Sequence, residues 1–296
     1  MIRRRRTTVP VESYDRAGGT WRDDAGPDTL TLATFNIWFD EYHAEQRYRA
    51  ISELLAQRLP DVVVLQEVTP AALDIVDSQD WVRQHYRRAA VVGAGVGNYG
   101  MVVLSRLAMS DVTYTPLPTR LSRGFLRASC TVGGTELVVC NIHLDSGKHS
   151  AGLRVRQLRR IFRALRRAGD AVVLGDFNMR DAENRHIAPP YRDVWPALRP
   201  TEPGFTEDTD INLMRWDSKP KHRQVRFDRV LLKGDSWAAS EIELLGTEPI
   251  SPATPRVFPS DHFGLWCRLV RRNHPPRPTL RGRWKGRLWD RFRSSR

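Results

Sequence analysis

Short apolar segments that end in polar, chemically capable residues recur along this chain. Residues 62–65, for example, are followed by Glu67, and residues 172–174 are followed by Asp176 and Asn178. Runs of this length and composition are typical of buried strands, so the polar side chains are expected at strand ends. A single residue of this kind is usually a turn or cap residue, but six such strand ends together indicate a functional site. The polar residues concerned are Asn36, Glu67, His143, Asp176, Asn178, Asp228, Asp261 and His262.

Helices are predicted between these strands. Residues 45–59 have helical apolar spacing that Pro60 ends, and residues 152–167 repeat apolar side chains on one helical face. Strands are expected at 29–38, 61–65, 99–105, 125–132, 136–142, 171–174, 227–232 and 263–270. This interspersed order predicts one α/β domain at 29–270, with its sheets at the centre and helices outside. A flexible N-terminal arm is expected at 1–28, and a basic, Trp-containing C-terminal tail at 271–296.

Positive charge is concentrated at the C-terminus. The 296 residues carry a formal charge of +13, and nine Arg and one Lys against one Asp lie in 271–296. The rest of the chain is therefore only weakly basic. The hydrophobic fraction of 41% excludes a wholly disordered chain. No apolar run approaches the ~20 residues of a membrane-spanning helix.

The three cysteines indicate neither a disulfide framework nor a zinc site, because the count is odd and no CxxC pair occurs. A Gly-Gly hairpin turn would place Cys130 opposite Leu137 rather than opposite Cys140. We therefore expect Cys130, Cys140 and Cys267 to be buried, reduced thiols. The N-terminal run of four arginines is not followed by an apolar segment, so we expect no secretory signal and a cytoplasmic protein.

The strand-end residues offer carboxylates, carboxamides and imidazoles, without a Cys or hydroxyl nucleophile among them. Hydrolysis of a phosphodiester needs a metal ion that withdraws charge from the phosphoryl oxygens, a group that orients or activates water, and donors to the transition-state oxygens. Carboxylate and amide oxygens select Mg²⁺ or Mn²⁺ over zinc. These residues therefore predict metal-dependent phosphodiester hydrolysis.

The order of the motifs resembles the endonuclease/exonuclease/phosphatase superfamily, which has the deoxyribonuclease I-like fold. The motifs are Asn36, Gln66-Glu67, His143, Gly175-Asp176-Phe177-Asn178, Phe227-Asp228-Arg229 and Ser260-Asp261-His262. The resemblance covers roughly residues 30–270. It implies a four-layered α/β sandwich, in which two central, mostly antiparallel sheets are flanked by helices and the site lies at one rim.

Longer strings resemble the type 2 tyrosyl-DNA phosphodiesterases, which remove tyrosine from DNA 5′ ends. These strings are residues 143–146, 175–181, 225–230, 243–246 and 258–265. The resemblance implies Mg²⁺ (or Mn²⁺) as the cofactor, with Glu67 as its ligand and Asp261 in its outer shell. Asn36 would lie beside the metal and the scissile phosphate.

The same resemblance implies the roles of the reacting groups. Asp176 would orient or deprotonate the attacking water. Asn178 would donate a hydrogen bond to a phosphoryl oxygen, and His143 would contact the phosphate. His262, held by Asp228, would stabilise the phosphoryl transition state.

One position departs from that family, which typically has a Trp walling the DNA where this chain has Glu207. Trp216 is a candidate replacement, so the departure bears on tyrosyl-DNA specificity and not on the hydrolytic centre. Lys148 and Arg154 lie close to His143 in sequence and are candidate substrate contacts. The complete set of substrate-binding candidates is Ser146, Lys148, Arg154, Phe205, Trp216 and Phe227.

Two other classes of function stay open. One is a phospholipid or inositol-phosphate phosphodiesterase or phosphatase on the same fold. The other is an inactive binding module, which should have lost some of the strand-end residues.

We expect nucleic acid, in particular DNA ends, as the partner, and we favour a monomer although no pattern determines the oligomeric state. The arginine-rich face of the helix at 152–167 is either solvated or faces DNA.

The C-terminal tail has its own pattern. Leu280, Trp284, Leu288 and Phe292 recur every four residues, among cationic neighbours. The tail is either disordered, docked on the domain, or ordered on an anionic surface, which would be nucleic acid or a membrane.

Overall fold

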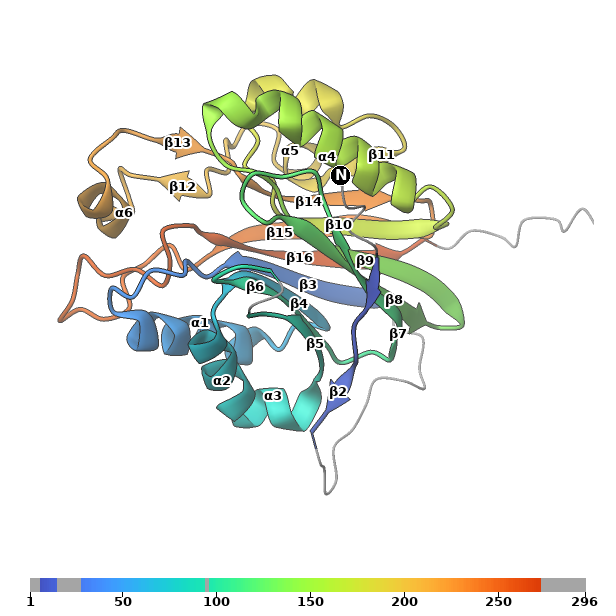
Figure 1. Cartoon of the computed structure of the whole chain (residues 1–296), viewed down its shortest axis with the longest axis horizontal. Helices are drawn as coiled ribbons and strands as arrows, with labels where there is room; N and C mark the ends of the chain where they lie inside the picture. The colour runs from blue at the N-terminus through green and yellow to red at the C-terminus, as the bar shows by residue number, and fades with distance from the viewer. Residues whose placement is uncertain (1–5, 15–27, 94–95, 273–296) are drawn as a thin grey trace, which may run out of the picture.

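Two seven-stranded sheets packed face to face form the centre of the molecule (Figure 1). The computed structural model describes residues 6–14, 28–93 and 96–272. Sheet I has the order β1 (Thr7–Thr8), β7 (Met109–Pro116), β8 (Gly124–Val132), β9 (Thr135–His143), β10 (Asp170–Asp176), β14 (Asp228–Lys233) and β11 (Tyr191–Asp193). Sheet II has the order β15 (Trp237–Leu245), β16 (Gly264–Arg271), β3 (Thr29–Asn36), β4 (Val62–Val68), β6 (Gly100–Ser105), β5 (Arg87–Val91) and β2 (Glu12–Ser13). Among the described strands, β9 with β10 and β3 with β4 are parallel, and the other pairs are antiparallel.

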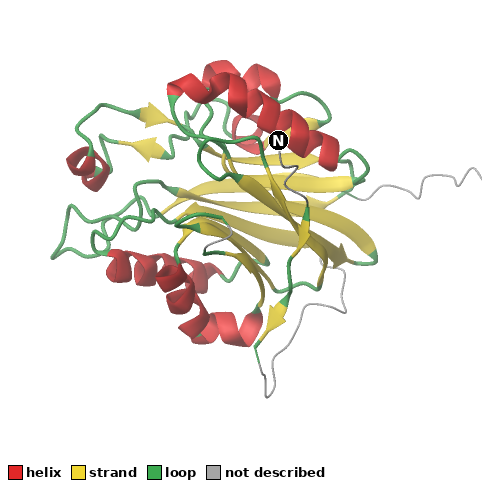
Figure 2. Cartoon of the chain, viewed as in Figure 1, coloured by secondary structure: helices red, strands yellow, loops and turns green. Residues whose placement is uncertain are grey.

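Helices cover the outer side of each sheet (Figure 2). On the sheet II side lie α1 (Ala44–Arg58), α2 (Pro70–Ser78) and α3 (Asp80–His85), and on the sheet I side lies α4 (Ala151–Ala164). The shorter elements are η1 (Lys148–Ser150), η2 (Asp181–His186), α5 (Val194–Leu198), β12 (Glu207–Asp208), α6 (Leu213–Ser218) and β13 (Gln224–Val225). Among the helices of the described segments, none is long and apolar enough to span a bilayer.

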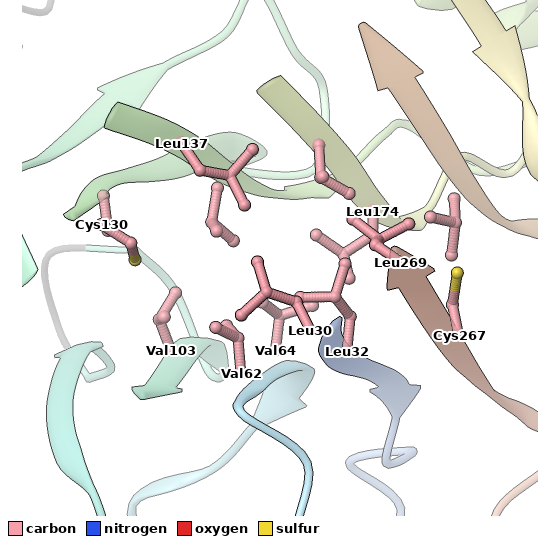
Figure 3. Packing of buried hydrophobic residues seen from close by; sticks show 14 of the residues in the cluster. Leu30, Leu32, Val62, Val64, Val103, Cys130, Leu137, Leu174, Cys267 and Leu269 are labelled. Carbon is pink, nitrogen blue, oxygen red and sulfur yellow. The ribbon is translucent and has the colours of Figure 1, made fainter. Parts of the chain in front are cut away.

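The main core lies between the two sheets. Figure 3 shows Leu30 and Val62 of sheet II close to residues of sheet I such as Leu137 and Leu174, all fully buried. Two further apolar clusters bind α1–α3 to sheet II and α4 to sheet I. Because both faces of each sheet are covered, β4 reads as an uninterrupted buried segment rather than an alternating one. The structure thus has the four layers that the resemblance implied.

The hairpin between β8 and β9 has the predicted register. Val132 is paired with Thr135, and Cys130 with Leu137. Cys130, Cys140 and Cys267 are buried and unpaired, as expected. Burial raises the pKa of the Cys130 thiol to about 12, so it stays protonated and unreactive.

The prediction of a flexible arm at 1–28 is wrong for residues 6–14. β1 pairs with β7 in sheet I, β2 pairs with β5 in sheet II, and Val9 between them is 6% exposed. Pairs of two residues leave no periodicity in the sequence, which is why the arm gave no strand signal. The rest of the arm, at 1–5 and 15–27, and the tail from 273 lie outside the described residues. The helix predicted at 152–167 is α4, which ends three residues earlier.

Candidate active site

The site lies where the C-terminal ends of two parallel strand pairs meet, one pair in each sheet. In sheet I the strand register places Asp176 beside His143 on one side and beside Asp228 on the other. In sheet II, Asn36 ends β3 and Glu67 lies near the end of β4. Asn36 Nδ2 donates a hydrogen bond of 3.1 Å to Asp176 Oδ2, which joins the two sheets at this rim.

Asp176 is the buried centre of this network. Its Oδ2 accepts a 2.8 Å hydrogen bond from Asn178 Nδ2, and its Oδ1 accepts one of 2.8 Å from the Asn178 backbone N–H. Burial alone would raise the pKa of Asp176, but contacts with His143, the charge of His262 and the Asn178 N–H hold it well below its usual value. Asp176 is therefore an ionised hydrogen-bond acceptor at every physiological pH.

His262 forms a buried ion pair with Asp228. His262 Nδ1 lies 2.8 Å from Asp228 Oδ2. The Thr206 hydroxyl accepts a 3.0 Å hydrogen bond from the Asp228 N–H, and the Ser260 hydroxyl accepts one of 3.2 Å from the His262 N–H. Burial would lower the pKa of His262, yet the Asp228 carboxylate raises it well above its ordinary value. His262 is consequently a cationic donor at neutral pH.

His143, by contrast, is neutral. Arg123 Nη1 lies 3.0 Å from His143 Nδ1, so this nitrogen accepts and the other, Nε2, carries the proton. Burial and the Arg123 charge lower the pKa of His143 to about 4. His143 Nε2 lies 3.3 Å from Asp176 Oδ2 and 3.7 Å from Glu67 Oε1. Within the described part of the chain, it forms no well-aligned hydrogen bond with either carboxylate or with any other residue. This N–H is a buried donor aimed among the carboxylates.

Glu67 occupies a strained backbone position. Its φ is +59°, and it is the extra residue of a bulge, since Gln66 pairs with Met101 while Val68 pairs with Gly100. A non-glycine residue in this region costs about 1–3 kcal/mol, and bulges commonly re-aim a side chain at a site. The bulge turns Glu67 toward the rim, where its Oε2 accepts a 3.3 Å hydrogen bond from the Phe39 N–H.

The carboxylates fit a hard divalent cation at Glu67. Burial and the neighbouring charge of Asp261 raise the pKa of Glu67 to about 7, and burial also raises the pKa of Asp261. A cation between them would offset both the desolvation and the repulsion. Asp176, Asp228 and His262 also lie within 4.8 Å of one another, but protonated His262 has no lone pair to offer. Glu67, with Asp261 nearby, is therefore the better cation site.

The prediction that Arg154 contacts substrate is wrong. Its side chain is 1% exposed, and its Nε and Nη2 donate to Glu183 at 2.9 and 2.7 Å. Its Nη1 donates 2.8 Å hydrogen bonds to the carbonyl oxygens of Asp145 and Gly147. Arg154 therefore anchors the loop after β9 to α4, and its burial keeps it out of reach of a ligand.

The other substrate-binding candidates differ in exposure. Ser146 is exposed in the loop after β9, Lys148 is exposed at the start of η1, and Trp216 is 38% exposed on α6. Phe205 is half-buried. Phe227 is 5% exposed, and its ring centroid lies 6.1 Å from that of His262.

Glu207 lies below the surface and could not wall a ligand. It is 2% exposed, and its two oxygens pair with Arg215 at 2.7 Å and with Arg223 at 3.2 Å. The same Arg215 lies 3.7 Å from Asp261. This position therefore braces the loop that carries Asp261.

Several residues at the rim were missed by the sequence analysis. Arg123 fixes the tautomer of His143 and donates a 2.9 Å hydrogen bond to the Tyr99 hydroxyl. Tyr99 in turn stacks on exposed Phe39, with 4.6 Å between the ring centroids. Arg123 lies outside the predicted strands, and although Phe39 follows one and Tyr99 begins one, aromatic residues are common in strands and do not by themselves mark a site. Their role emerges only from the packing of separate loops.

The fold and the rim together define a class of enzyme. Residues 33–262 match the Endonuclease/Exonuclease/phosphatase family, and the chain belongs to this family. It is therefore a phosphodiesterase, a hydrolase of ester bonds, in a family of enzymes that depend on a divalent metal ion.

The particular proteins to which the chain is similar are tyrosyl-DNA phosphodiesterases. It is 30% identical to tyrosyl-DNA phosphodiesterase 2 of Homo sapiens, over 81% of this chain and 68% of that protein. It is 29% identical to that of Rattus norvegicus, over 85% and 69%. The crystal structure of the D. rerio protein complexed with single strand DNA product superposes with a TM-score of 0.72 at 26% identity, covering 81% of this chain and 98% of the other.

Proposed function

We propose that this enzyme hydrolyses the phosphodiester that links a tyrosyl group to a DNA 5′ end, with Mg²⁺ (or Mn²⁺) as cofactor. The observation that carries the proposal is the rim itself. An ionised acceptor, a cationic donor and the two carboxyl groups of Glu67 and Asp261 meet there, in a chain that is similar to tyrosyl-DNA phosphodiesterases over more than four fifths of its length.

In this proposal Glu67 would hold the metal ion with Asp261 in its outer shell, and the ion would neutralise charge on the phosphoryl oxygens. Asn36 is held in place by two hydrogen bonds, because its Oδ1 accepts one of 3.1 Å from the Trp38 N–H while its Nδ2 donates one to Asp176. Its side chain would thus lie between Glu67, which would hold the metal ion, and Asp176, which would orient the water.

Asp176 orients the attacking water. Its low pKa makes it a weak base, so accepting a hydrogen bond from water suits it better than removing a proton completely. Asn178, at φ +51°, holds this carboxylate through its side chain and its backbone N–H. The neutral His143 N–H then faces the phosphate as a donor. Both Nδ2 hydrogens of Asn178 are engaged, one by Asp176 Oδ2 and one by the Leu144 carbonyl oxygen at 3.2 Å, so Asn178 would have to exchange one of these partners to donate to the phosphate.

His262 supplies positive charge to the transition state. Its ion pair with Asp228 keeps it protonated, and preorganised donors of this kind are typically worth ~10²–10³ in rate. A tyrosyl phenolate has a pKa of about 10 in water, so it leaves more readily than an alkoxide and needs little further acid catalysis.

For the substrate-facing surface we propose the exposed residues Ser146, Lys148 and Trp216, together with Phe205 and Phe227. Trp216 takes the place of the aromatic wall, since Glu207 is buried. We also propose that the enzyme is cytoplasmic and monomeric, and the three unpaired, buried thiols are consistent with a reducing compartment.

A substrate panel tests the proposal. Purified protein with Mg²⁺ is assayed on a 5′-tyrosyl oligonucleotide, on plain duplex DNA and on sphingomyelin, with Asp176→Asn as the control for contaminating activity. Release of tyrosine that Asp176→Asn lacks is the expected result. Preferential cleavage of sphingomyelin would instead establish the phospholipid alternative, and cleavage of plain DNA alone would establish a nuclease.

A further inference from the structure

A groove lined by arginines lies outside the candidate active site, along the side of α4. Its volume is about 810 Å³, and none of the strand-end residues of the site lines it. One wall is the helix and the turn after it, and the other wall is formed by β7, β8 and the start of β9. Figure 1 shows α4 on the sheet I side, opposite α1–α3. The arginines of the helical wall are Arg156, Arg159, Arg160, Arg163, Arg166 and Arg167.

These six arginines are exposed and uncompensated. Within the described segments none of them forms an ion pair, and residues 151–169 contain no acidic residue. The opposite wall differs, because its Arg127 pairs with Asp111 at 2.9 Å and lies 4.0 Å from Glu136. The charge of the helical wall is therefore available to an external anion.

The spacing of the arginines works against the helix itself. Pairs such as Arg156 with Arg160 and Arg159 with Arg163 stand four residues apart on the helix. Like charges at this spacing destabilise a helix by about 0.2–0.5 kcal/mol per pair. Interaction with the helix dipole can offset this repulsion for Arg163, which lies in the last turn, but not for the arginines of earlier turns. Binding of an anionic ligand would explain why arginines stand at all of these positions.

The dimensions suit a nucleic-acid backbone. Within α4, Arg156 and Arg163 are seven positions apart, which corresponds to about 10 Å along a helix. One strand of duplex DNA presents about three phosphates over that length. Guanidinium groups match phosphate through two parallel hydrogen bonds.

The surroundings argue against a membrane as the ligand. The apolar side chains Leu158 and Ile161 point into the domain and are buried. The large exposed hydrophobic residues of the described chain are Phe39, Tyr42, Leu121, Ile211 and Trp216, and none of them lines the groove. A membrane-binding helix needs exposed apolar side chains next to its cationic ones.

We propose that this groove binds the phosphodiester backbone of duplex DNA, as a second contact in addition to the candidate active site. The choice of DNA among polyanions rests on the proposed function, whereas the groove and its unpaired charge do not.

The test compares two variants of the full chain, each with three arginines replaced. The groove variant is Arg156→Gln, Arg159→Gln and Arg163→Gln. The control variant is Arg49→Gln, Arg58→Gln and Arg83→Gln, on α1 and α3 at the opposite layer. Binding to a ~30-base-pair duplex is measured in EDTA over a series of salt concentrations, where log K against log[salt] flattens by ~0.9 for each phosphate that the protein no longer neutralises.

The groove variant should flatten this slope by about 2–3, while the control variant should resemble the unmodified protein. Turnover of a short single-stranded 5′-tyrosyl oligonucleotide should be the same for all three proteins. Equal slopes for both variants would overturn the inference and leave the proposed function intact. A flattened slope without activity on any phosphodiester would overturn the proposed function alone. If the groove variant lost binding to phosphatidylserine vesicles but not to DNA, the ligand would be a membrane, and the inference would be wrong.

Discussion

At the residue scale, Glu67 combines backbone strain with a raised pKa. A buried acid whose pKa is raised in the folded state binds a proton more tightly there than in the unfolded state. Between the ordinary value and about 7, the folded protein therefore holds more protons, and its stability falls as the pH rises. At neutral pH the effect is on the order of 3 kcal/mol, from 1.36 kcal/mol per pKa unit.

We accordingly expect the metal-free protein to become less stable between about pH 5 and pH 8, and Mg²⁺ to reverse this destabilisation. Urea unfolding in EDTA and in Mg²⁺ at several pH values measures both effects. The variant Glu67→Gln should show a flatter pH dependence and a smaller response to Mg²⁺. If Glu67→Gln and the unmodified protein kept the same pH dependence in EDTA, the assignment of the cation to Glu67 would be refuted.

The catalytic assignments lead to a second prediction. Asp176→Asn and His262→Ala should each reduce turnover by at least ~10²-fold, because each removes a preorganised transition-state contact. Both residues lie at the rim rather than in the apolar core, so the variants should fold. Exposed Asp210 gives a matched control, Asp210→Asn, with near-native turnover expected. Near-native turnover in a folded Asp176→Asn or His262→Ala would show that the site lies elsewhere.

Arg154 provides a third prediction, since its role is structural. Arg154→Leu leaves Glu183 buried without its partner, and breaking such a pair costs about 3–5 kcal/mol. Burial would raise the pKa of Glu183, but Arg154 holds this pKa below its usual value. The ion pair therefore stabilises the folded protein at pH values above the ordinary pKa of a glutamate. The difference between Arg154→Leu and the unmodified protein should therefore narrow as the pH falls below about 4.

Chemical denaturation at pH 7 and at acid pH measures this difference. Exposed Arg160 supplies the control, because Arg160→Leu should change stability by no more than about 0.5 kcal/mol. A large rise in KM with unchanged stability in Arg154→Leu would restore it as a substrate contact.

These residues show what a sequence can reveal about a site. Asp176, His143 and Glu67 were found because each lies within two residues of the end of a predicted strand, and that position is local. The burial of Arg154 depends on Glu183, which lies 29 residues away, and Arg123 reaches His143 across 20 residues. No local pattern contains those contacts, so sequence alone placed Arg154 wrongly and missed Arg123.

At the element scale, the two parallel strand pairs explain why the site lies at one rim. β3 with β4 and β9 with β10 run in the same direction within each pair, so their C-terminal ends deliver Asn36, Glu67, His143 and Asp176 together. Eight of the strands and the two long helices could be predicted from their apolar patterns, whereas β5, β7 and β15 were not predicted. The short β1 and β2 have no such periodicity, and only edge pairing with β7 and β5 defines them.

The arm that contains β1 and β2 should contribute to stability. It occupies one edge of each sheet, and edges left open favour aggregation. Val9→Ala is expected to lower the free energy of unfolding by about 1–2 kcal/mol, since Val9 belongs to the main core. The half-buried Val11 offers the control, and Val11→Ala should cost less. Equal, negligible effects in urea unfolding would show that the arm is not docked in solution.

At the scale of the whole molecule, opposite charges are segregated. The acidic rim holds Glu67, Asp176, Asp228 and Asp261, whereas the groove beside α4 is cationic. Separate regions can thus serve a metal ion and a polyanion without neutralising each other. A DNA molecule that lies along the groove would be attracted over a distance comparable to the Debye length, about 10 Å at 0.1 M salt.

The C-terminal tail is a second cationic region of the sequence. Residues 273–296 carry seven Arg and one Lys against one Asp, and they lie outside the described residues. Truncation after Arg272 keeps β16 whole and leaves every candidate site residue in place. We therefore expect an unchanged rate for the bound substrate but weaker DNA binding, with a log K against log[salt] slope flatter by ~0.9 for each phosphate that the tail would otherwise neutralise.

The measurement is a salt titration of full-length and truncated protein on duplex DNA, with anionic vesicles in parallel. A full-length chain with Trp284→Ala and Trp289→Ala separates the aromatic contribution from the charge. An unchanged slope after truncation would exclude the tail from DNA binding, and weaker vesicle binding alone would assign it to a membrane surface.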